Sequence, residues 1–482
     1  MCRFFSQLVV GMSRIGTSFS VSLLIVAPMF SVQAQTWDDA QGNPQWSKSQ
    51  NWVGRQTPSN DGQADVFFGF GIHPGIFIDK AWNIRSLTFL SDSGAYRFYG
   101  AALTIQGGGI NNFGAPTQFF TNTLALGQNQ TWNQAGGDIT SYGTVSLGSA
   151  TLTIDGAKNL SLFGPVTGSG SLFKQGSGVL SLSGTNSFTG GIIATQGVLE
   201  FGNNRAAGYG DIRFNNATLR ASINGLTLTN RFFLSGTATV AGPNSITLAG
   251  NVVLTADQTI DVLNTGSITI RGQVQESGGV RSLRKIGAGI LDLAGSSDFS
   301  GTTTVDAGTL TVSGNDALAM TSGVQVNSSA TFNLGGIDPI NRVRDGAMLT
   351  LSGGNLVANS HTETFGRLTL EQNSKIVLSP GGLAGTLVFA DALRIGGTLT
   401  IDGWTGNAGQ PGTDDRIIFT TAPGNDFLQN VLFSGYSPGA TLLPTGEIVP
   451  VPEPGPLALL AVGISAFCFR SLRRQLRFRR PA

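Results

Sequence analysis

The sequence predicts an all-β solenoid that lies between two terminal segments with the character of targeting signals. Three observations support this fold class. Apolar and polar residues alternate over about five positions and then stop at Gly or Asn, as in half-buried strands separated by turns. Glycine supplies 68 of the 482 residues, and no stretch of the body shows a sustained helical stripe. The block 172–204 recurs at 283–315, which indicates stacked repeats.

Residues 1–34 have the composition of a secretory signal peptide. Arg3 and Arg14 precede the apolar run VSLLIVAPMF, and the small-x-small triplet VQA follows at 32–34. We therefore expect signal peptidase to cut between Ala34 and Gln35. An N-terminal membrane anchor that is never cut is the alternative.

Residues 35–70 are expected to cap the first turn of the solenoid. A stack of parallel strands exposes unpaired backbone groups and core at its ends, so each end needs a cover. Trp37, Trp46 and Trp52 lie within this loop-rich segment and are three of the six tryptophans in the chain. A cap is the favoured interpretation, and a stacking platform for sugar rings is the alternative.

Residues 71–446 are expected to form the solenoid itself. Segments such as ATLTIDG, GSITIRG and GTLTIDG alternate with a period of two and end at glycine. At ~20–25 residues per rung, the body would give roughly 17–20 rungs and a rod of about 80–95 Å. Helix is expected only near the two termini.

The two copies of the repeat align without a gap at a constant offset of 111 residues. The alternating leucines of each copy should point inward from one strand, and the conserved phenylalanine should fill the core beside a corner. Gly184 and Gly295 follow these leucines, and we expect them to be corner residues with positive φ. The residues that match are Lys174 and Lys285, Leu180 and Leu291, Leu182 and Leu293, Gly184 and Gly295, Phe188 and Phe299, and Gly197 and Gly308.

This motif resembles the autotransporter-associated β-strand repeat, whose pattern runs K-x-G-x-G-x-L-x-L-x-G-x-N-x-F-x-G-G and then G-x-L. The first copy is nearly complete from Lys174 to Leu199, whereas the second has Ser297 where the first has Asn186. The resemblance implies a right-handed parallel β-helix, as in autotransporter passengers. The tail lacks the amphipathic strands of an autotransporter barrel, so we expect export across a second membrane to need other machinery.

Residues 447–482 are expected to be a linker and a sorting signal. Pro452, Glu453 and Pro454 precede an uncharged run at 456–469, and Arg470, Arg473 and Arg474 begin directly after it. The run is short for a membrane helix, but arginines that follow it would hold a single span with its C-terminus in the cytoplasm. The nearby LLPTGE lacks the spacer residue of a sortase signal, and we interpret it as a turn.

The order of these elements resembles the PEP-CTERM sorting signal. The resemblance implies that exosortase, a membrane protease, cuts near the Pro-Glu-Pro triplet. The protein would be anchored transiently in the inner membrane and then reach the cell surface or the extracellular space.

Composition excludes several classes of function for the exported body. The two cysteines, Cys2 and Cys468, fall in the terminal segments, so the body has no disulfide framework. Of the 29 Lys and Arg, two lie in the signal and six in the tail, which leaves 21 against 28 Asp and Glu and a net charge of about −7. An acidic body argues against a nucleic-acid partner.

Catalytic residues are not evident in the sequence. Parallel β-helices can host polysaccharide lyases and hydrolases, which need carboxylates clustered on one face. The candidates do not recur at a rung offset, and we expect them to lie in solvated loops; they are Asp257 with Asp261, Asp292 with Asp298, and Asp414 with Asp415. His73 and His361 lack metal-ligand spacing. No catalytic, cofactor or metal site is predicted.

The sequence therefore predicts a non-enzymatic exported protein of the cell surface or extracellular matrix, with a structural or adhesive role. Extracellular polysaccharide is a candidate partner. A carbohydrate-active β-helix enzyme, either a lyase or a hydrolase, and a carbohydrate-binding module are the alternatives. A row of carboxylates on one face would favour the enzyme, and a face lined by Thr and Asn would favour the structural protein.

Overall fold

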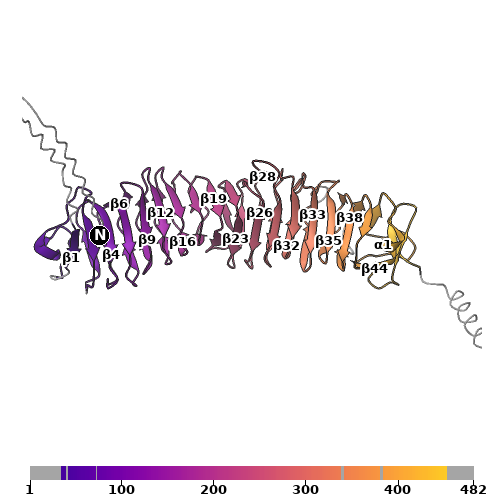
Figure 1. The fold of residues 1–482 in the computed structure, drawn as a ribbon, viewed down its shortest axis with the longest axis horizontal. Helices are drawn as coiled ribbons and strands as arrows, with labels where there is room; N and C mark the ends of the chain where they lie inside the picture. The colour runs from indigo at the N-terminus through magenta and orange to yellow at the C-terminus, as the bar shows by residue number, and fades with distance from the viewer. Residues whose placement is uncertain (1–33, 39–41, 72, 338–340, 380–383, 453–482) are drawn as a thin grey trace, which may run out of the picture.

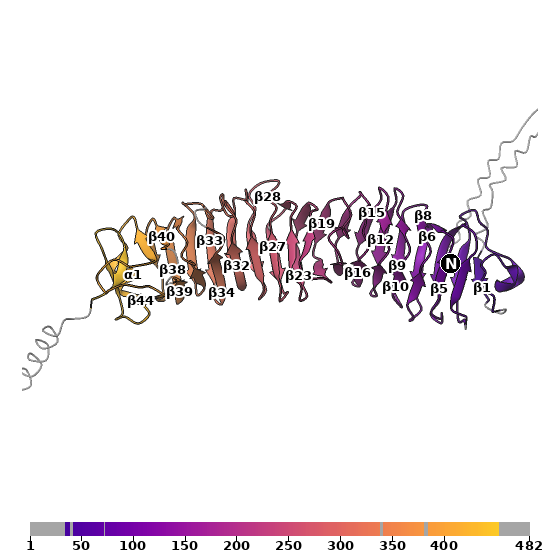
Figure 2. The same cartoon turned by 180° about the vertical axis from the view of Figure 1, so that it is seen from behind.

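The computed structural model describes residues 34–38, 42–71, 73–337, 341–379 and 384–452. In this part of the chain the fold is a parallel β-solenoid of about 16 turns. It is drawn out as a rod, with β1 (Ala34–Trp37) at one end and β44 (Val431–Phe433) near the other (Figure 1). The view from behind shows the same stack of coils without a break (Figure 2). The predicted all-β solenoid is confirmed.

Each coil passes in turn through a first, a second and a third face, and each strand pairs in parallel with the equivalent strand of the next coil. The first face belongs to a 15-stranded sheet that also extends around a corner onto the third face near the N-terminus. Its strands are β1 (Ala34–Trp37), β2 (Asp65–Phe68), β4 (Trp82–Phe89), β6 (Leu103–Asn112), β8 (Leu124–Leu126), β9 (Gln130–Asn133), β11 (Val145–Ser146), β12 (Thr151–Asp155), β14 (Val166–Thr167), β15 (Ser171–Lys174), β17 (Ile192–Ala194), β19 (Ile212–Asn215), β22 (Phe232–Ser235), β25 (Val252–Leu254) and β28 (Val274–Glu276).

The second face is a 16-stranded sheet with one strand per coil. Its strands are β3 (Gly75–Ile78), β5 (Arg97–Gly100), β7 (Gln118–Phe120), β10 (Ile139–Ser141), β13 (Leu160–Leu162), β16 (Val179–Leu182), β18 (Val198–Phe201), β20 (Thr218–Ala221), β23 (Thr237–Ala241), β26 (Gln258–Val262), β29 (Leu283–Ile286), β31 (Thr302–Val305), β33 (Gly323–Asn327), β35 (Met348–Ser352), β38 (Leu368–Gln372) and β41 (Ala392–Arg394). The rod is thus slightly shorter than the 17–20 rungs predicted, and β1 and β2, from the segment expected to be the N-terminal cap, already pair with the stack.

The third face is a 10-stranded sheet in the C-terminal half. Its strands are β21 (Leu226–Leu228), β24 (Ile246–Leu248), β27 (Ser267–Ile270), β30 (Ile290–Leu293), β32 (Gly308–Val312), β34 (Ala330–Leu334), β36 (Asn355–Val357), β39 (Ser374–Val377), β42 (Leu399–Asp402) and β44 (Val431–Phe433). Nearer the N-terminus, β4 and β6 bend around a corner, so that their first halves and β8, β11 and β14 form this face.

A small sheet continues the first face at the C-terminal end; it contains β37 (Glu363–Phe365), β40 (Thr386–Phe389) and β43 (Arg416–Phe419).

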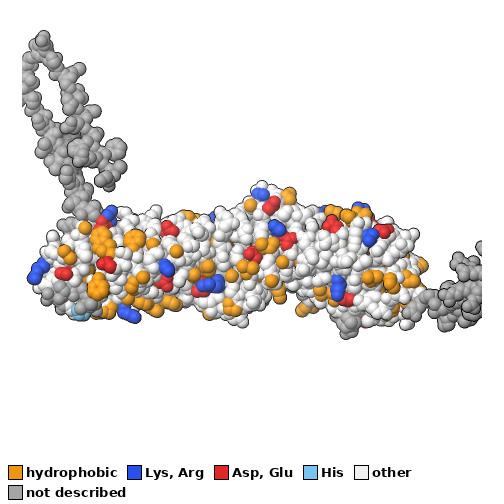
Figure 3. Space-filling view, turned by 60° about the horizontal axis from the view of Figure 1, so that its bottom comes forward, with side chains coloured by type: hydrophobic (Ala, Val, Ile, Leu, Met, Phe, Trp, Pro, Cys, Tyr) orange, Lys and Arg blue, Asp and Glu red, His pale blue; other side chains and the backbone are white. Residues whose placement is uncertain are grey.

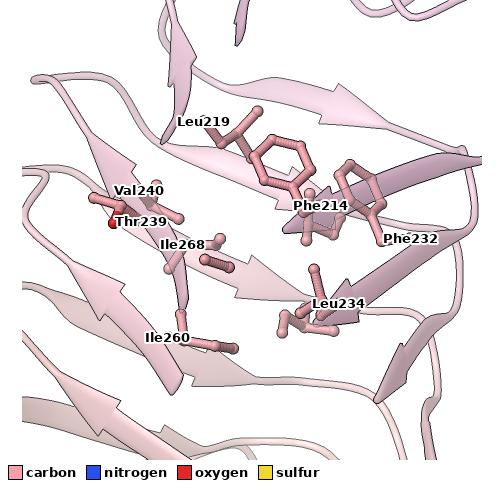
Figure 4. Close-up of a pocket in the computed structure, with 11 residues that line it drawn as sticks. Phe214, Leu219, Phe232, Leu234, Thr239, Val240, Ile260 and Ile268 are labelled. Atoms are coloured by element: carbon pink, nitrogen blue, oxygen red, sulfur yellow. The ribbon is translucent and has the colours of Figure 1, made fainter. Parts of the chain in front are cut away.

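The core runs along the rod axis and is filled by every second residue of each strand. In both repeat copies the predicted leucines are fully buried, as are Phe188 and Phe299. Between the copies the packing leaves an apolar void of about 20 Å³, lined from all three faces by residues that include Phe214, Leu219 and Ile268 (Figure 4). Such a void has room for about one water and no polar partner for it, so it is a packing gap and not a ligand site.

The two repeat copies do not lie on the same faces. The leucine strand of the first copy, β16, belongs to the second face, whereas that of the second copy, β30, belongs to the third. Along the first face, five steps lead from β15 to β28, and the chain then moves on by one face to β29. The offset of 111 residues therefore corresponds to five coils and one third of a turn.

Gly184 and Gly295 lie at corners, but neither has a positive φ, so that part of the prediction is wrong. The need for glycine comes from the neighbouring coil. A Cβ on Gly184 would overlap the carbonyl oxygen of Gly164, and one on Gly295 would overlap that of Gly272. Positive φ occurs instead at the later motif glycines, Gly197 and Gly308.

The N-terminal end is closed by an aromatic cluster. Trp46 and Trp52 are fully buried and Trp37 nearly so, and the rings of Trp46 and Trp52 meet edge to face at 4.9 Å. Two short 3-10 helices, η1 (Ser49–Asn51) and η2 (Val53–Arg55), carry the chain around this cluster.

The C-terminal end is closed by a different set of elements. The short helix α1 (Asn425–Gln429) buries Phe427 against Phe419, and it is a helix that the sequence did not predict in the body. The antiparallel pair β45 (Ala440–Leu442) and β46 (Ile448–Pro450) completes the cap. Residues 447–450, expected in the linker, lie in this cap with Glu447 buried. The predicted turn at LLPTGE joins the two strands.

Candidate functional site

The carboxylate pairs considered for catalysis serve as local hydrogen-bond acceptors. Asp415 is buried and accepts from the backbone N–H groups of Gly385 at 2.7 Å and Ser379 at 3.0 Å. Its neighbour Asp414 accepts from the hydroxyl of Thr405 at 2.8 Å. Asp415 thus ties together loops of the C-terminal region. The expectation from the sequence that Asp415 lies in a solvated loop is wrong, because its side chain is buried.

Three members of the other two pairs also bridge adjacent coils. Asp257 accepts from the N–H of Ser282 at 3.0 Å, and Asp298 from that of Glu276 at 2.9 Å. Asp292 accepts from the hydroxyl of Ser313 at 2.6 Å, and partial burial raises its pKa. These contacts hold the coils in register along the rod. Asp261 lies on β26 and Asp292 on β30, so the expectation that they lie in loops is wrong for these two residues.

A buried ion pair that the sequence analysis missed lies at the start of the C-terminal region. Arg342 and Glu363 are both buried, with Nη1 and Oε2 separated by 3.9 Å. Burial raises the pKa of Glu363 to about 7, although the N–H groups of Arg342 and Val343 and the guanidinium act in the opposite direction. Because both groups are shielded from solvent, we assign them to the structure of the first face and not to a reaction.

Metal-binding geometry is not found among the residues that the structure describes: no three His, Cys, Asp or Glu side chains come close enough to hold an ion. His73 and His361 precede different strands, β3 and β37, far apart along the rod. The tryptophans considered for sugar stacking are buried in the N-terminal cluster, so their rings are not open to a ligand.

The motif lysines are structural. Lys174 and Lys285 are buried, and the Nζ of Lys285 donates to the carbonyl oxygens of Gly287 at 2.7 Å and of Ala307, in the next coil, at 2.9 Å. Lys174 makes the equivalent bonds to Gly176 and Gln196. Burial lowers the pKa of each lysine to about 8, while Asp155 and Asp261 act in the opposite direction. The motif pattern alone, with lysine fixed before two glycines, was the only signal for this role.

The outer surface of the third face carries a ladder of hydroxyl side chains. Thr227, Thr247 and Thr269 lie in register on successive coils, with Asp292 and Thr311 next in the same row. The side of the rod in Figure 3 is mostly uncharged, with scattered acidic and basic groups. A Thr-lined face of this kind is the pattern that favours a structural protein over an enzyme.

A polar groove of about 470 Å³ opens beside the N-terminal coils. Gln106, Gln128, Asp61 and the glycines at 107 and 108 line it. Arg85 also reaches this groove, but its guanidinium is paired with Asp65, and that hydrogen bond raises the pKa of Arg85. The groove can form hydrogen bonds with a ligand, and its free charge is the exposed carboxylate of Asp61.

Comparison with protein families identifies both motifs. The family described as passenger-associated-transport-repeat matches residues 172–201 and 283–312, and the family described as PEP-CTERM protein-sorting motif matches residues 450–474. The chain carries passenger repeats and a PEP-CTERM sorting motif. Both predicted resemblances are therefore confirmed.

A curated relative is the adhesin BmaC autotransporter of Brucella suis biovar 1 (strain 1330), which is 28% identical over 314 residues. The match covers 62% of this chain and 9% of the relative, so the chain spans a small part of that protein's length. No solved structure matches the chain.

The predicted targeting segments lie almost wholly outside the described residues. Ala34 and Gln35 begin β1, and Pro452 is the last described residue. Glu453, Pro454, the apolar run at 456–469 and the arginines that follow it are not described, nor are residues 1–33. Among the residues that are described, no helix has the length and apolar character needed to cross a membrane.

Proposed function

We propose that this exported repeat protein is a non-enzymatic rod that acts outside the cell by adhesion or by building extracellular material. The observation that carries the proposal is the combination of a rod built from passenger repeats with a PEP-CTERM motif directly after its C-terminal cap. The candidate carboxylates support it, because Asp257, Asp298 and Asp415 accept hydrogen bonds from backbone N–H groups of neighbouring segments. The relative named as an adhesin supports the adhesive role.

The route to the surface follows from the two termini. Signal peptidase would cut between Ala34 and Gln35, and the run at 456–469 would hold the chain in the inner membrane, with Arg470, Arg473 and Arg474 on the cytoplasmic side. An exosortase would then act near Pro452, Glu453 and Pro454 and release the rod to the surface or to extracellular polysaccharide.

Mass spectrometry of the protein recovered from the cell surface and medium tests this route. The expected mature form begins near Gln35 and ends near the Pro-Glu-Pro triplet. The variant Glu453→Ala should accumulate in the inner membrane with its arginine tail intact. Recovery of extracellular protein that still carries the arginine tail would contradict the proposed processing.

A surface-attachment assay with cells that display the chain tests the role itself. Cells should lose attachment when the gene is deleted and recover it with the full chain. Incubation of the purified protein with an array of polysaccharides should release no shorter chains, whereas cleavage of any polymer would identify an enzyme instead.

A further inference from the structure

An unusual group of charges lies on the outer surface of the first face, near the middle of the rod. Arg213 on β19 is in register with Phe233 on β22. Asp211 and Arg231 lie two residues before them on the same coils, and therefore on the same side of the sheet. The inward neighbours Ile212 and Phe232 are buried. The four outward side chains therefore form a compact square on the sheet.

Both arginines contact one aromatic ring. The Cζ atoms of Arg213 and Arg231 lie 4.2 and 4.6 Å from the centroid of Phe233, so the two guanidinium groups are within about 9 Å of each other. Neither guanidinium makes a hydrogen bond within the part of the chain that the structure describes. Among the described residues, the only ion contact of either arginine is between Arg213 and Asp211, at 3.9 Å. Within this part of the chain, Arg231 has no carboxylate partner.

A hollow of about 320 Å³ lies beside this square. Gly190, Gly210 and the hydroxyl-bearing Thr189 line it. Ile193, in register with Arg213 on the preceding coil, is 42% exposed at its edge. The hollow is within the lower size range of small-molecule sites and combines apolar, hydroxyl and charged groups.

We propose that Ile193, Asp211, Arg213, Arg231 and Phe233, here called the Arg213 site, bind carboxylate-bearing sugar units of an acidic polysaccharide. A guanidinium matches a carboxylate with two parallel hydrogen bonds, and the stacking on Phe233 already fixes its orientation. Asp211 can accept hydrogen bonds from sugar hydroxyls. Ile193 and the edge of Phe233 can contact the apolar C–H face of a ring.

Charge complementarity selects the ligand. The body is acidic overall, so two arginines held together on one ring are an exception that an anionic group would compensate. At the polar groove near the N-terminus, by contrast, Asp65 already pairs with the available arginine. The inference rests on the proposed adhesive function only in that the polymer is extracellular. Binding at the site can be measured separately from adhesion.

Binding of the full chain to immobilised polygalacturonate, measured by biolayer interferometry, tests the Arg213 site. We expect Arg213→Gln and Arg231→Gln each to raise the apparent Kd about tenfold. Arg205→Gln is the matched control, because it removes one charge from an exposed side chain elsewhere and should leave Kd unchanged. Methyl-esterified polygalacturonate and dextran, which lack carboxylates, should bind weakly or not at all.

Three outcomes would overturn the proposal: an equal loss in Arg205→Gln, equal binding of the esterified polymer, or binding of dextran sulfate or poly-glutamate without binding of polygalacturonate. Circular dichroism of each variant checks the fold. Attachment assays separate this site from the broader role. If wild-type protein does not bind polygalacturonate but cells still attach, also with Arg213→Gln, the adhesive function stands and the Arg213 site is refuted. If the protein binds polygalacturonate but cells do not attach, the Arg213 site stands and the adhesive function is refuted.

Discussion

The two copies of the repeat share a sequence pattern but lie on different faces of the rod. In the first copy the motif lysine is on the first face and the leucine pair on the second, whereas in the second copy both are advanced by one face. The corner glycines move with them and lie against backbone carbonyls of the coil before, in both copies. The motif therefore specifies a strand, a corner and the next strand, and does not specify an absolute direction around the axis.

The copies differ at one position in a way that the structure explains. Asn186 accepts from the N–H of Val166 at 2.8 Å and donates to the carbonyl of Ala206 at 2.6 Å, so it joins three coils. Ser297 only donates to Ala317, at 2.7 Å, and the N–H of Val274 bonds to the backbone of Ser296 instead. A regular backbone bond replaces the asparagine side chain in the second copy.

The largest effect is expected at the corner glycines. Gly184→Val and Gly295→Val should each cost on the order of 4 kcal/mol or prevent folding, because the new side chain meets backbone atoms that cannot move aside. Ser183→Val and Thr185→Val are the controls and should be mild. Urea denaturation measures the change, and a mild Gly184→Val would show that close approach of the coils does not require glycine there.

Truncation of the core leucines comes next. Leu180→Ala and Leu291→Ala should each lower the free energy of unfolding by ~2–5 kcal/mol, since both side chains are fully buried. Similar losses are expected although the residues lie on different faces. A loss in one variant alone would refute the equivalence of the copies, and two silent changes in denaturant melts would refute the role of both leucines in the core.

A smaller difference is expected between Asn186→Ala and Ser297→Ala. The first leaves a buried donor and a buried acceptor unpaired and should cost about 2 kcal/mol, whereas the second leaves one acceptor and should cost about 1 kcal/mol. Equal losses in thermal melts of the two variants would mean that the bridge through Asn186 adds nothing to the serine contact.

The mildest test uses pH. Each motif lysine has a pKa of about 8 in the folded protein, against about 10.4 in an unfolded chain. Between these values the unfolded state binds more protons, so the free energy of unfolding should rise with pH across that window. Below the window both states are protonated, and these lysines add no pH dependence. The double variant Lys174→Met, Lys285→Met should lose this rise, and parallel pH profiles for both proteins would contradict it.

The sequence predicts the repetitive part of the molecule well, because leucine alternation and recurring glycines report directly on inward and corner positions. It misses features that depend on how coils stack. The rotation by one face cannot be read from an offset of 111 residues without the true coil length, and the reason for glycine at Gly184 is a neighbour about 20 positions away in the chain. The pairing of Arg342 with Glu363 and the square around Arg213 also depend on stacking register. The charges at both places carry no local sequence signal.

The C-terminal cap determines how the rod can be held. β46 is buried and antiparallel to β45, and it ends at Pro450, two residues before Pro452. The chain thus leaves the stack at its tip, with almost no slack between the last packed strand and the sorting motif (Figure 1). Any attachment made near Pro452 holds the rod by its C-terminal end, so the long sides of the rod stay free. The aromatic N-terminal end of the rod then lies about 75 Å from the attachment, the height of 16 coils.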